Sequence, residues 1–264
     1  MSRVTSKDGT SIAYDRQGDG PAVILIGGGL LDPVTGRDGR WENAPLAAAL
    51  AERFTVYNYD RRGRGDSGDT PPYALDRELE DLHALIAEAG GTAHLYGLSS
   101  GGAVALEAAA AGLPVDRVAT YEVPYSVTDD MVRRWNQYVE QFGVALAEGR
   151  RGDAVELFMR VAGSSDEEIA GARRSPLWPK LEAIAPTLAY DAVCLGDGRP
   201  PSARLATITR PTLVATGGDA PFFEQAADAI ATAVQRAQRI TIEGQGHIAD
   251  PQTVASVLER FYTQ

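Results

Sequence analysis

The chain has 264 residues, 44% of them hydrophobic and 23% charged, which is the composition of an ordinary globular protein and fits one α/β unit with insertions. Its 25 Lys and Arg residues against 36 Asp and Glu residues give a formal charge of −11, which disfavours nucleic-acid and anionic-membrane partners. The single cysteine, Cys194, excludes an internal disulfide and a cysteine-based zinc site. The N-terminus carries no apolar leader, so we expect a cytoplasmic protein.

The first expected elements are two antiparallel strands. Lys7-Asp8-Gly9 separates the β-prone runs 4–5 and 10–16, and an Asp-Gly pair in such a place favours a hairpin. Short apolar runs follow along the chain and predict strands buried on both faces, as in a parallel sheet. These runs cover residues 22–26, 54–59, 93–98, 118–123, 212–215 and 239–242.

Helical patterns lie between several of these strands. Residues 75–86 carry leucine or isoleucine at helical spacing, and the alanine-rich segment 103–111 stops at Gly112. Asp250 and Pro251 have the residue types of an N-cap and a first helical position, so they mark the start of the last helix. The alternation predicts an α/β fold, with a mostly parallel sheet flanked by helices.

The alternation of predicted strands and helices breaks between about residues 125 and 204. We expect no strands there, and hydrophobic residues recur along helical stretches. Such an insertion between two strands would lie over the carboxyl edge of the sheet, where α/β folds bind ligands. We therefore predict a core of residues 1–124 and 205–264 with a helical lid of residues 125–204. Ordinary crossover helices are the alternative, but the segment is far longer than one crossover requires.

The sharpest motif is Gly97-Leu98-Ser99-Ser100-Gly101. It is a G-x-S-x-G pattern that follows one predicted strand and opens a predicted helix, which is the context of a nucleophile elbow. Its two glycines would remove side chains that collide in a tight, strained turn. Ser99 is therefore the candidate nucleophile, and a glycine-serine turn without chemistry is the alternative.

A nucleophilic serine needs a general base, and the chain contains three histidines. His83 lies in a predicted helix and His94 in a predicted strand, where packing or surface roles suffice. His247 instead follows the strand 239–242 in a glycine-rich loop, and loops at strand ends commonly carry catalytic groups. We take His247 as the general base and acid.

These features together resemble the α/β-hydrolase superfamily. The resemblance rests on the elbow at 97–101, the late loop histidine His247 and the stretch Asp-Arg-Arg-Gly-Arg-Gly-Asp-Ser at 60–67, and it spans nearly the whole chain. Residues 97–102, followed by Tyr-Glu-Val-Pro at 121–124, are similar to the zearalenone-lactonase branch and related small bacterial hydrolases. The resemblance implies an α/β-hydrolase fold with an inserted helical lid.

The resemblance also implies the remaining site residues. The backbone N–H groups of Ser100 and of Gly29, which matches the donor position of the family's His-Gly-x loop, would hold the oxyanion. Two acids keep the order serine, acid, histidine. Asp219 follows the strand 212–215, the commonest place in the superfamily, whereas Glu122 matches the lactonase-like Glu-Val-Pro pattern. We favour Glu122 and keep Asp219 as the alternative.

The sequence thus predicts a metal-independent serine esterase or lactonase acting on a weakly polar small molecule through an acyl-enzyme. No clustered Cys and His ligands and no phosphate-loop spacing point to a cofactor. Trp178 is the candidate lid residue that touches the substrate, and packing in the lid core is its alternative role. Carbon–carbon bond hydrolysis, perhydrolysis and ligand binding without turnover are the alternative functions. The sequence leaves homodimer formation open.

Overall fold

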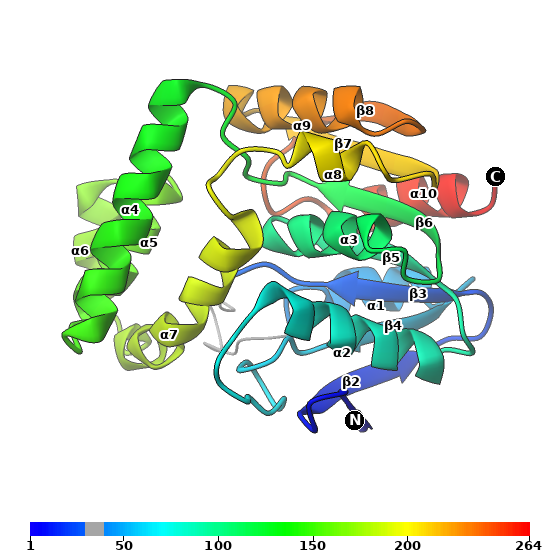
Figure 1. Cartoon of the computed structure of the whole chain (residues 1–264), viewed down its shortest axis with the longest axis horizontal. Coiled ribbons are helices and arrows are strands. Elements are labelled where there is room, and N and C mark those ends of the chain that lie inside the picture. The colour runs from blue at the N-terminus through cyan, green and yellow to red at the C-terminus, as the bar shows by residue number, and fades with distance from the viewer. Residues whose placement is uncertain (30–39) are drawn as a thin grey trace.

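The computed structural model describes residues 1–29 and 40–264. Within these ranges the strands form one sheet (Figure 1). They are β1 (Ser2–Thr5), β2 (Ser11–Gln17), β3 (Ala22–Ile26), β4 (Thr55–Tyr59), β5 (Ala93–Leu98), β6 (Val115–Tyr121), β7 (Thr212–Gly218) and β8 (Ala237–Gln245). Their spatial order is β1-β2-β4-β3-β5-β6-β7-β8. Pairing is antiparallel from β1 to β2 and from β2 to β4, and parallel from β4 through β8.

Helices cover both faces of this sheet. They are α1 (Ala44–Leu50), α2 (Leu75–Glu88), α3 (Ser100–Ala110), α4 (Asp129–Ala147), α5 (Arg151–Val161), α6 (Asp166–Arg173), α7 (Trp178–Leu195), α8 (Ser202–Leu205), α9 (Pro221–Ala233) and α10 (Pro251–Tyr262). Helices α2, α3, α8 and α9 pack on one face, and α1 and α10 pack on the other. Among the described residues, no helix has the length and apolar character needed to cross a bilayer.

The predicted α/β fold is confirmed, including its opening hairpin, in which Thr5 pairs with Ser11. The start of the last helix is also as predicted, because the Asp250 side chain accepts a hydrogen bond from the Thr253 N–H at 2.8 Å. Several strand boundaries differ from the expected ones by one to three residues. The strand expected over 118–123 ends at Tyr121, because the next residue, Glu122, has a backbone φ of +49° that leaves the extended conformation.

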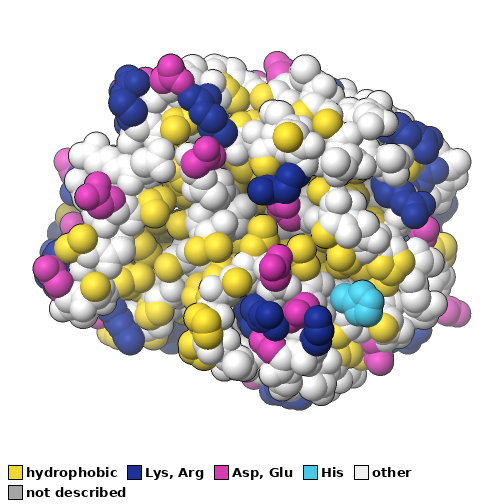
Figure 2. Space-filling model, viewed as in Figure 1, with side chains coloured by type: hydrophobic (Ala, Val, Ile, Leu, Met, Phe, Trp, Pro, Cys, Tyr) yellow, Lys and Arg dark blue, Asp and Glu magenta, His cyan; other side chains and the backbone are white. Residues whose placement is uncertain are grey.

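The predicted lid segment contains α4 to α7. Helices α4, α5 and α6 gather at one end of the sheet, on the left of Figure 1, and α7 leads from them back to the core. These helices enclose a hydrophobic cluster of their own, built from residues such as Phe142, Val155 and Leu188. On the face shown in Figure 2, acidic and basic side chains are interspersed among hydrophobic ones. The action of this segment as a lid stays a prediction.

Candidate active site

Ser99 lies where β5 ends and α3 begins. Its backbone has φ of +55° and ψ of −127°, a conformation that residues other than glycine seldom adopt. Its N–H donates to the carbonyl oxygen of Tyr121, on the neighbouring strand β6, at 2.9 Å. Ser99 is partly exposed. The turn therefore presents this serine at the carboxyl ends of the parallel strands, where ligands bind in α/β folds.

The two glycines of the motif allow the backbone to approach itself closely. A Cβ on Gly97 would lie 2.4 Å from the carbonyl oxygen of Gly101, and a Cβ on Gly101 would lie 2.4 Å from that of Ile26. No side chain fits at these distances. The strand and the helix can form this tight turn because both positions lack a Cβ.

The carboxylate of Glu122 contacts the imidazole of His247. Glu122 Oε2 lies 2.7 Å from His247 Nδ1, although the two residues are 125 positions apart in the sequence. The other carboxylate oxygen accepts a hydrogen bond from the Gly217 N–H at 3.0 Å. The Glu122 side chain is 1% exposed and that of His247 is 31% exposed. A buried acid thus orients a histidine that stays partly exposed, and no hydrogen bond within residues 1–29 and 40–264 uses the Nε2 of that histidine.

Two further contacts hold His247 in place. The ring of Phe223, near the start of α9, stacks on the imidazole with centroids 4.9 Å apart and planes 7° apart. The Tyr121 hydroxyl donates to the carbonyl oxygen of Gly246 at 2.7 Å, which fixes the loop just before the histidine. Sequence analysis did not identify Phe223. The sequence shows an aromatic residue near the start of a helix after β7. The contact of its ring with His247, however, exists only in the folded chain, so the sequence alone does not predict it.

The alternative acid, Asp219, lies elsewhere. It is exposed in the connection between β7 and α9, and within residues 1–29 and 40–264 it makes no hydrogen bond or ion pair. A Cβ added at Gly246 would lie 3.2 Å from Asp219 Oδ2. The structure therefore brings Glu122, and not Asp219, into contact with His247 Nδ1.

The two expected oxyanion donors lie in the loop after β3 and in the first turn of α3, which meet beside Ser99. Ser100 is the first residue of α3, so its N–H belongs to the unpaired N-terminal turn of the helix. Gly29 follows β3, in a loop where a Cβ on Gly28 would lie 3.1 Å from the Cβ of Ser99. The structure brings Gly29 and Ser100 to the same edge of the sheet. Their role as donors stays a prediction.

Two buried arginines contact the carbonyl groups of the glycine loop. Arg61 Nη1 lies 3.4 Å from the carbonyl oxygen of Gly27, and Arg64 Nη1 donates to that of Gly28. Both arginines also pair with Asp191 on α7. The distance to an Asp191 carboxylate oxygen is 2.8 Å for Arg61 and 2.5 Å for Arg64. A helix of the predicted lid is thereby connected to the loop beside the candidate nucleophile.

Asp191 is the centre of this cluster. It also accepts a hydrogen bond from the Ser100 hydroxyl at 2.7 Å, while Arg61 has a second carboxylate partner, Glu78, at 2.7 Å. Burial alone would raise the pKa of Asp191, but the positive charges of Arg64 and Arg61 and the Ser100 hydroxyl hold it below its ordinary value. Asp191 is therefore ionised at neutral pH.

Sequence analysis did not identify this cluster. The available signal was the group of arginines at 61, 62 and 64, which directly follows a buried strand. Arginine is almost never fully buried unless it is paired, so arginines in this place indicate buried carboxylate partners. Asp191, the partner of Arg61 and Arg64, stands 127 positions beyond Arg64, and no local pattern connects these residues.

Glu42 is a second acid that the sequence did not single out. Its Oε2 accepts a hydrogen bond from the Gly28 N–H at 2.7 Å. Its Oε1 is buried and has no hydrogen-bond partner in the described part of the chain. Burial raises the pKa of Glu42, against the opposing effects of the Gly28 N–H and of the positive charge of Arg64. Glu42 therefore holds the Gly27–Gly28 peptide by its N–H, while Arg61 lies at the carbonyl oxygen of the same peptide.

Trp178 packs inside the helical cluster of the predicted lid. Its side chain is 8% exposed, and the guanidinium of Arg173 lies 5.6 Å from its ring centroid. These contacts give Trp178 a part in holding α5, α6 and α7 together. Its contact with a substrate stays a prediction.

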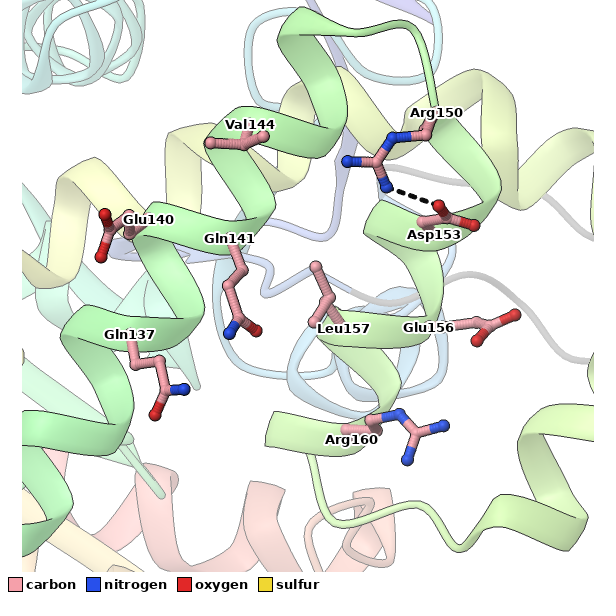
Figure 3. Close-up of a pocket in the computed structure, with 9 residues that line it drawn as sticks. All are labelled: Gln137, Glu140, Gln141, Val144, Arg150, Asp153, Glu156, Leu157 and Arg160. Carbon is pink, nitrogen blue, oxygen red and sulfur yellow. Dashed lines mark hydrogen bonds and ion pairs between the residues drawn. The ribbon is translucent and has the colours of Figure 1, made fainter.

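A groove of about 570 Å³ runs between α4 and α5, on the insertion itself (Figure 3). Most of its lining is polar or charged, and an ion pair between Arg150 and Asp153 closes one end, with 2.5 Å between their nearest atoms. Its lining includes none of the predicted site residues. The lining residues are Gln137, Glu140, Gln141, Val144, Arg150, Asp153, Glu156, Leu157 and Arg160.

Residues 23–257 match the alpha/beta hydrolase family. This range covers both Ser99 and His247 and most of the chain. Together with the sheet order and the turn at Ser99, it defines the class of protein: the chain belongs to the alpha/beta hydrolase family and has the fold of that family.

The chain is similar over its full length to a solved alpha/beta hydrolase from Sphaerobacter thermophilus DSM 20745. The two are 46% identical with a TM-score of 0.86, and the match covers 99% of this chain and 100% of that one. The enol-lactonase from Burkholderia xenovorans LB400 shares the fold, with 22% identity, a TM-score of 0.66 and complete coverage of both chains.

Among curated proteins, the chain is similar to the uncharacterized hydrolase YraK of Bacillus subtilis. The two are 31% identical over 103 residues, which is 38% of this chain and 35% of YraK. The chain therefore matches about a third of the length of that relative.

The Asp191 cluster generates a prediction about stability. Replacing Asp191 by Asn leaves two buried guanidinium groups without a shared carboxylate, and removing one partner of a buried ion pair typically costs about 3–5 kcal/mol. Urea denaturation should therefore show a large loss in the free energy of unfolding for Asp191→Asn. Asp153→Asn is the matched control, because its exposed pair with Arg150 should contribute only about 0–1 kcal/mol.

The contribution of Asp191 to the free energy of unfolding depends on pH. The folded-state pKa of Asp191 is below its ordinary value, so ionised Asp191 stabilises the fold above about pH 4. This contribution is lost as the pH falls through the folded-state pKa, and the difference between wild type and Asp191→Asn should shrink there. Equal stability of the two proteins at pH 7 would show that the cluster does not stabilise the fold.

Proposed function

We propose that the protein is a serine hydrolase that cleaves a carboxylic ester or lactone of a weakly polar small molecule through an acyl-enzyme on Ser99. The observation that supports this most directly is the 2.7 Å contact between Glu122 Oε2 and His247 Nδ1. A carboxylate at Nδ1 favours the tautomer whose Nε2 carries a lone pair. That lone pair is what a general base needs to activate a serine hydroxyl.

In the proposed reaction, Ser99 Oγ attacks the carbonyl carbon and transfers its proton to His247 Nε2. In the described residues the Ser99 hydroxyl makes no hydrogen bond, and catalytic hydrogen bonds of unliganded sites often tighten only when substrate binds. The developing oxyanion is held by the N–H groups of Gly29 and Ser100. Collapse breaks the bond to the leaving oxygen, which takes the proton from His247.

Water completes the proposed cycle. His247 removes a proton from a water molecule, whose oxygen attacks the acyl carbon and forms a second tetrahedral intermediate. Collapse then breaks the bond to Ser99 Oγ, which regains its proton from His247 and releases the carboxylic acid. No redox partner or other co-reactant enters this scheme.

The substrate class follows from the surroundings of the site and from similarity. The resemblance of residues 121–124 to the zearalenone-lactonase branch favours a lactone, and a solved enol-lactonase shares the fold. The aromatic and aliphatic residues of the predicted lid segment favour a weakly polar substrate, because apolar side chains dominate small-molecule pockets. Trp178 is our proposed contact from the lid.

Ser99→Ala tests the nucleophile. We expect kcat/KM for aryl esters and lactones to fall by roughly three to six decades, because Ser99 and His247 act as one unit. The melting temperature should hold, since the change removes one hydroxyl from a partly exposed turn. His247→Ala should be as damaging, and the double variant should lose little more. Retained hydrolysis in Ser99→Ala would eliminate the serine mechanism.

Glu122→Gln tests the acid. The amide keeps the shape of the side chain but disfavours the productive histidine tautomer, so we expect kcat to fall by about four decades with KM nearly unchanged. Asp219→Asn is the matched control, and we expect its kcat to stay within about twofold of wild type because asparagine serves turns as well as aspartate. If Asp219→Asn were the damaging change and Glu122→Gln the mild one, the assignment of the acid would be reversed.

A further inference from the structure

The second oxyanion donor belongs to a run of three glycines. Glycine imposes little preference on its own backbone, so the sequence alone does not fix the direction of the peptide planes in this loop. An oxyanion donor is effective only if its N–H is already aimed at the place where the charge develops. Other parts of the chain must therefore orient the peptide between Gly28 and Gly29.

Contacts on the preceding peptide hold it from both sides. The carbonyl oxygen of Gly27 lies 3.4 Å from Arg61 Nη1, and the N–H of Gly28 donates to Glu42 Oε2 at 2.7 Å. The carbonyl and N–H of one trans peptide point in opposite directions. The arginine and the glutamate therefore fix the plane of this peptide between them.

The peptide between Gly28 and Gly29 is held on one side only. Its carbonyl oxygen accepts a hydrogen bond from Arg64 Nη1. By the same geometry, the N–H of Gly29 points away from Arg64, and in the described residues no hydrogen bond uses it. Arg64 thus gives this N–H its direction, and the part of the chain that the structure describes places no acceptor on it.

Arg64 is in turn held by α7. Its Nη2 lies 2.5 Å from Asp191 Oδ2 and donates to the carbonyl oxygen of Thr187 at 3.1 Å. The other oxygen of Asp191 accepts the Ser100 hydroxyl at 2.7 Å, and a Cβ on Gly29 would lie 2.9 Å from Asp191 Oδ2. One carboxylate from the insertion therefore bonds to Ser100 and lies close beside Gly29, the two residues that carry the proposed donors.

We propose that Arg64 and Asp191 are positioning residues for the oxyanion hole, and that the seating of α7 on the core sets the direction of the Gly29 N–H. This inference rests on the proposed acyl transfer at Ser99. Neither side chain needs to touch the substrate. Oxyanion stabilisation consequently depends on an ion pair between the sheet loop and a helix some 127 positions away.

Arg62 provides a matched control within the same loop. Its side chain is fully buried and is held by two carboxylates, Asp81 at 2.7 Å and Asp8 at 2.9 Å, much as Arg64 is held by Asp191. Within residues 1–29 and 40–264 its hydrogen bonds go to these carboxylates and to the carbonyl oxygen of Arg77, and none goes to the glycine loop. A general loss of packing should therefore affect Arg62 and Arg64 variants alike, whereas loss of peptide orientation should affect only Arg64.

The first measurement compares Arg64→Lys with Arg62→Lys. Lysine keeps the charge but lacks the planar fork that serves Gly28, Thr187 and Asp191 together. For Arg64→Lys we expect kcat on p-nitrophenyl butyrate to fall by roughly 10²-fold, the scale of one lost oxyanion donor. KM should stay within about threefold, because the lost interaction belongs to the transition state. Arg62→Lys should lower the melting temperature and leave kcat near wild type.

The binding of two ligands distinguishes a loss of peptide orientation from a general loss of folding. Butaneboronic acid can form a tetrahedral adduct with Ser99, and its affinity should fall in Arg64→Lys by the same factor as kcat. The affinity of an ether isostere of the ester, which has no carbonyl oxygen, should be unchanged. Equal losses for both ligands, or equal losses of kcat in the Arg62 and Arg64 variants, would overturn the proposal.

Ser100→Ala is the second variant, chosen because it removes one hydroxyl and keeps the backbone N–H. It frees Ser100 from Asp191, and we expect kcat to fall by about tenfold with KM unchanged. A kcat equal to that of wild type would remove Asp191 from the proposal.

The crystal structures of wild type and Arg64→Lys provide a readout independent of activity. We expect the Gly28–Gly29 peptide to be rotated in the variant. An unchanged peptide would overturn the positioning role even if the wild type is an efficient esterase. If the wild type hydrolyses no ester or lactone, the proposed function fails, and the peptide orientation still decides whether Arg64 directs the Gly29 N–H.

Discussion

Two neighbouring strands of the sheet, β5 and β6, are each followed directly by a residue that has a positive backbone φ although it is not glycine. These residues are Ser99, with φ of +55°, and Glu122, with φ of +49°, and the described residues contain no other non-glycine of this kind. Each such conformation costs about 1–3 kcal/mol. Adjacent strands offset that cost, because the Ser99 N–H bonds to Tyr121 and the Glu122 N–H bonds to Ala215. The candidate site depends on these two positive φ angles, because they turn Ser99 and Glu122 away from the paired strands at the carboxyl edge of the sheet.

Buried charge is the second organising feature. Arg61, Arg62 and Arg64 follow β4 and lie between the sheet and the helices, each paired with at least one carboxylate. Buried ion pairs contribute little net stability, because desolvation offsets the attraction, but they are sensitive to geometry. They are therefore suited to fixing orientation. The ion pairs of Arg61 and Arg64 connect the glycine loop to α7, so the predicted lid and the loop beside Ser99 are parts of one charge network.

The sequence predicts those parts of the fold and site that have local causes. The turn at Ser99 follows from five consecutive residues between a strand and a helix, and His247 follows from elimination among three histidines. Placing Glu122 in the site needed a family resemblance, because its φ of +49° ends a strand that its neighbours alone would extend to residue 123. Arg64 and Asp191 could not be predicted, because their pairing joins distant segments and exists only after the insertion has packed on the core.

The central claim is that catalysis proceeds through a covalent ester on Ser99, oriented by the Glu122–His247 pair. Rapid quenching of the wild-type protein with a slowly deacylating ester, followed by mass spectrometry of the intact chain and its peptides, tests it most directly. We expect a mass increase equal to the acyl group, confined to the peptide that contains Ser99 and appearing before product accumulates at its steady rate. Turnover of the ester with no adduct on Ser99 at any time would contradict it.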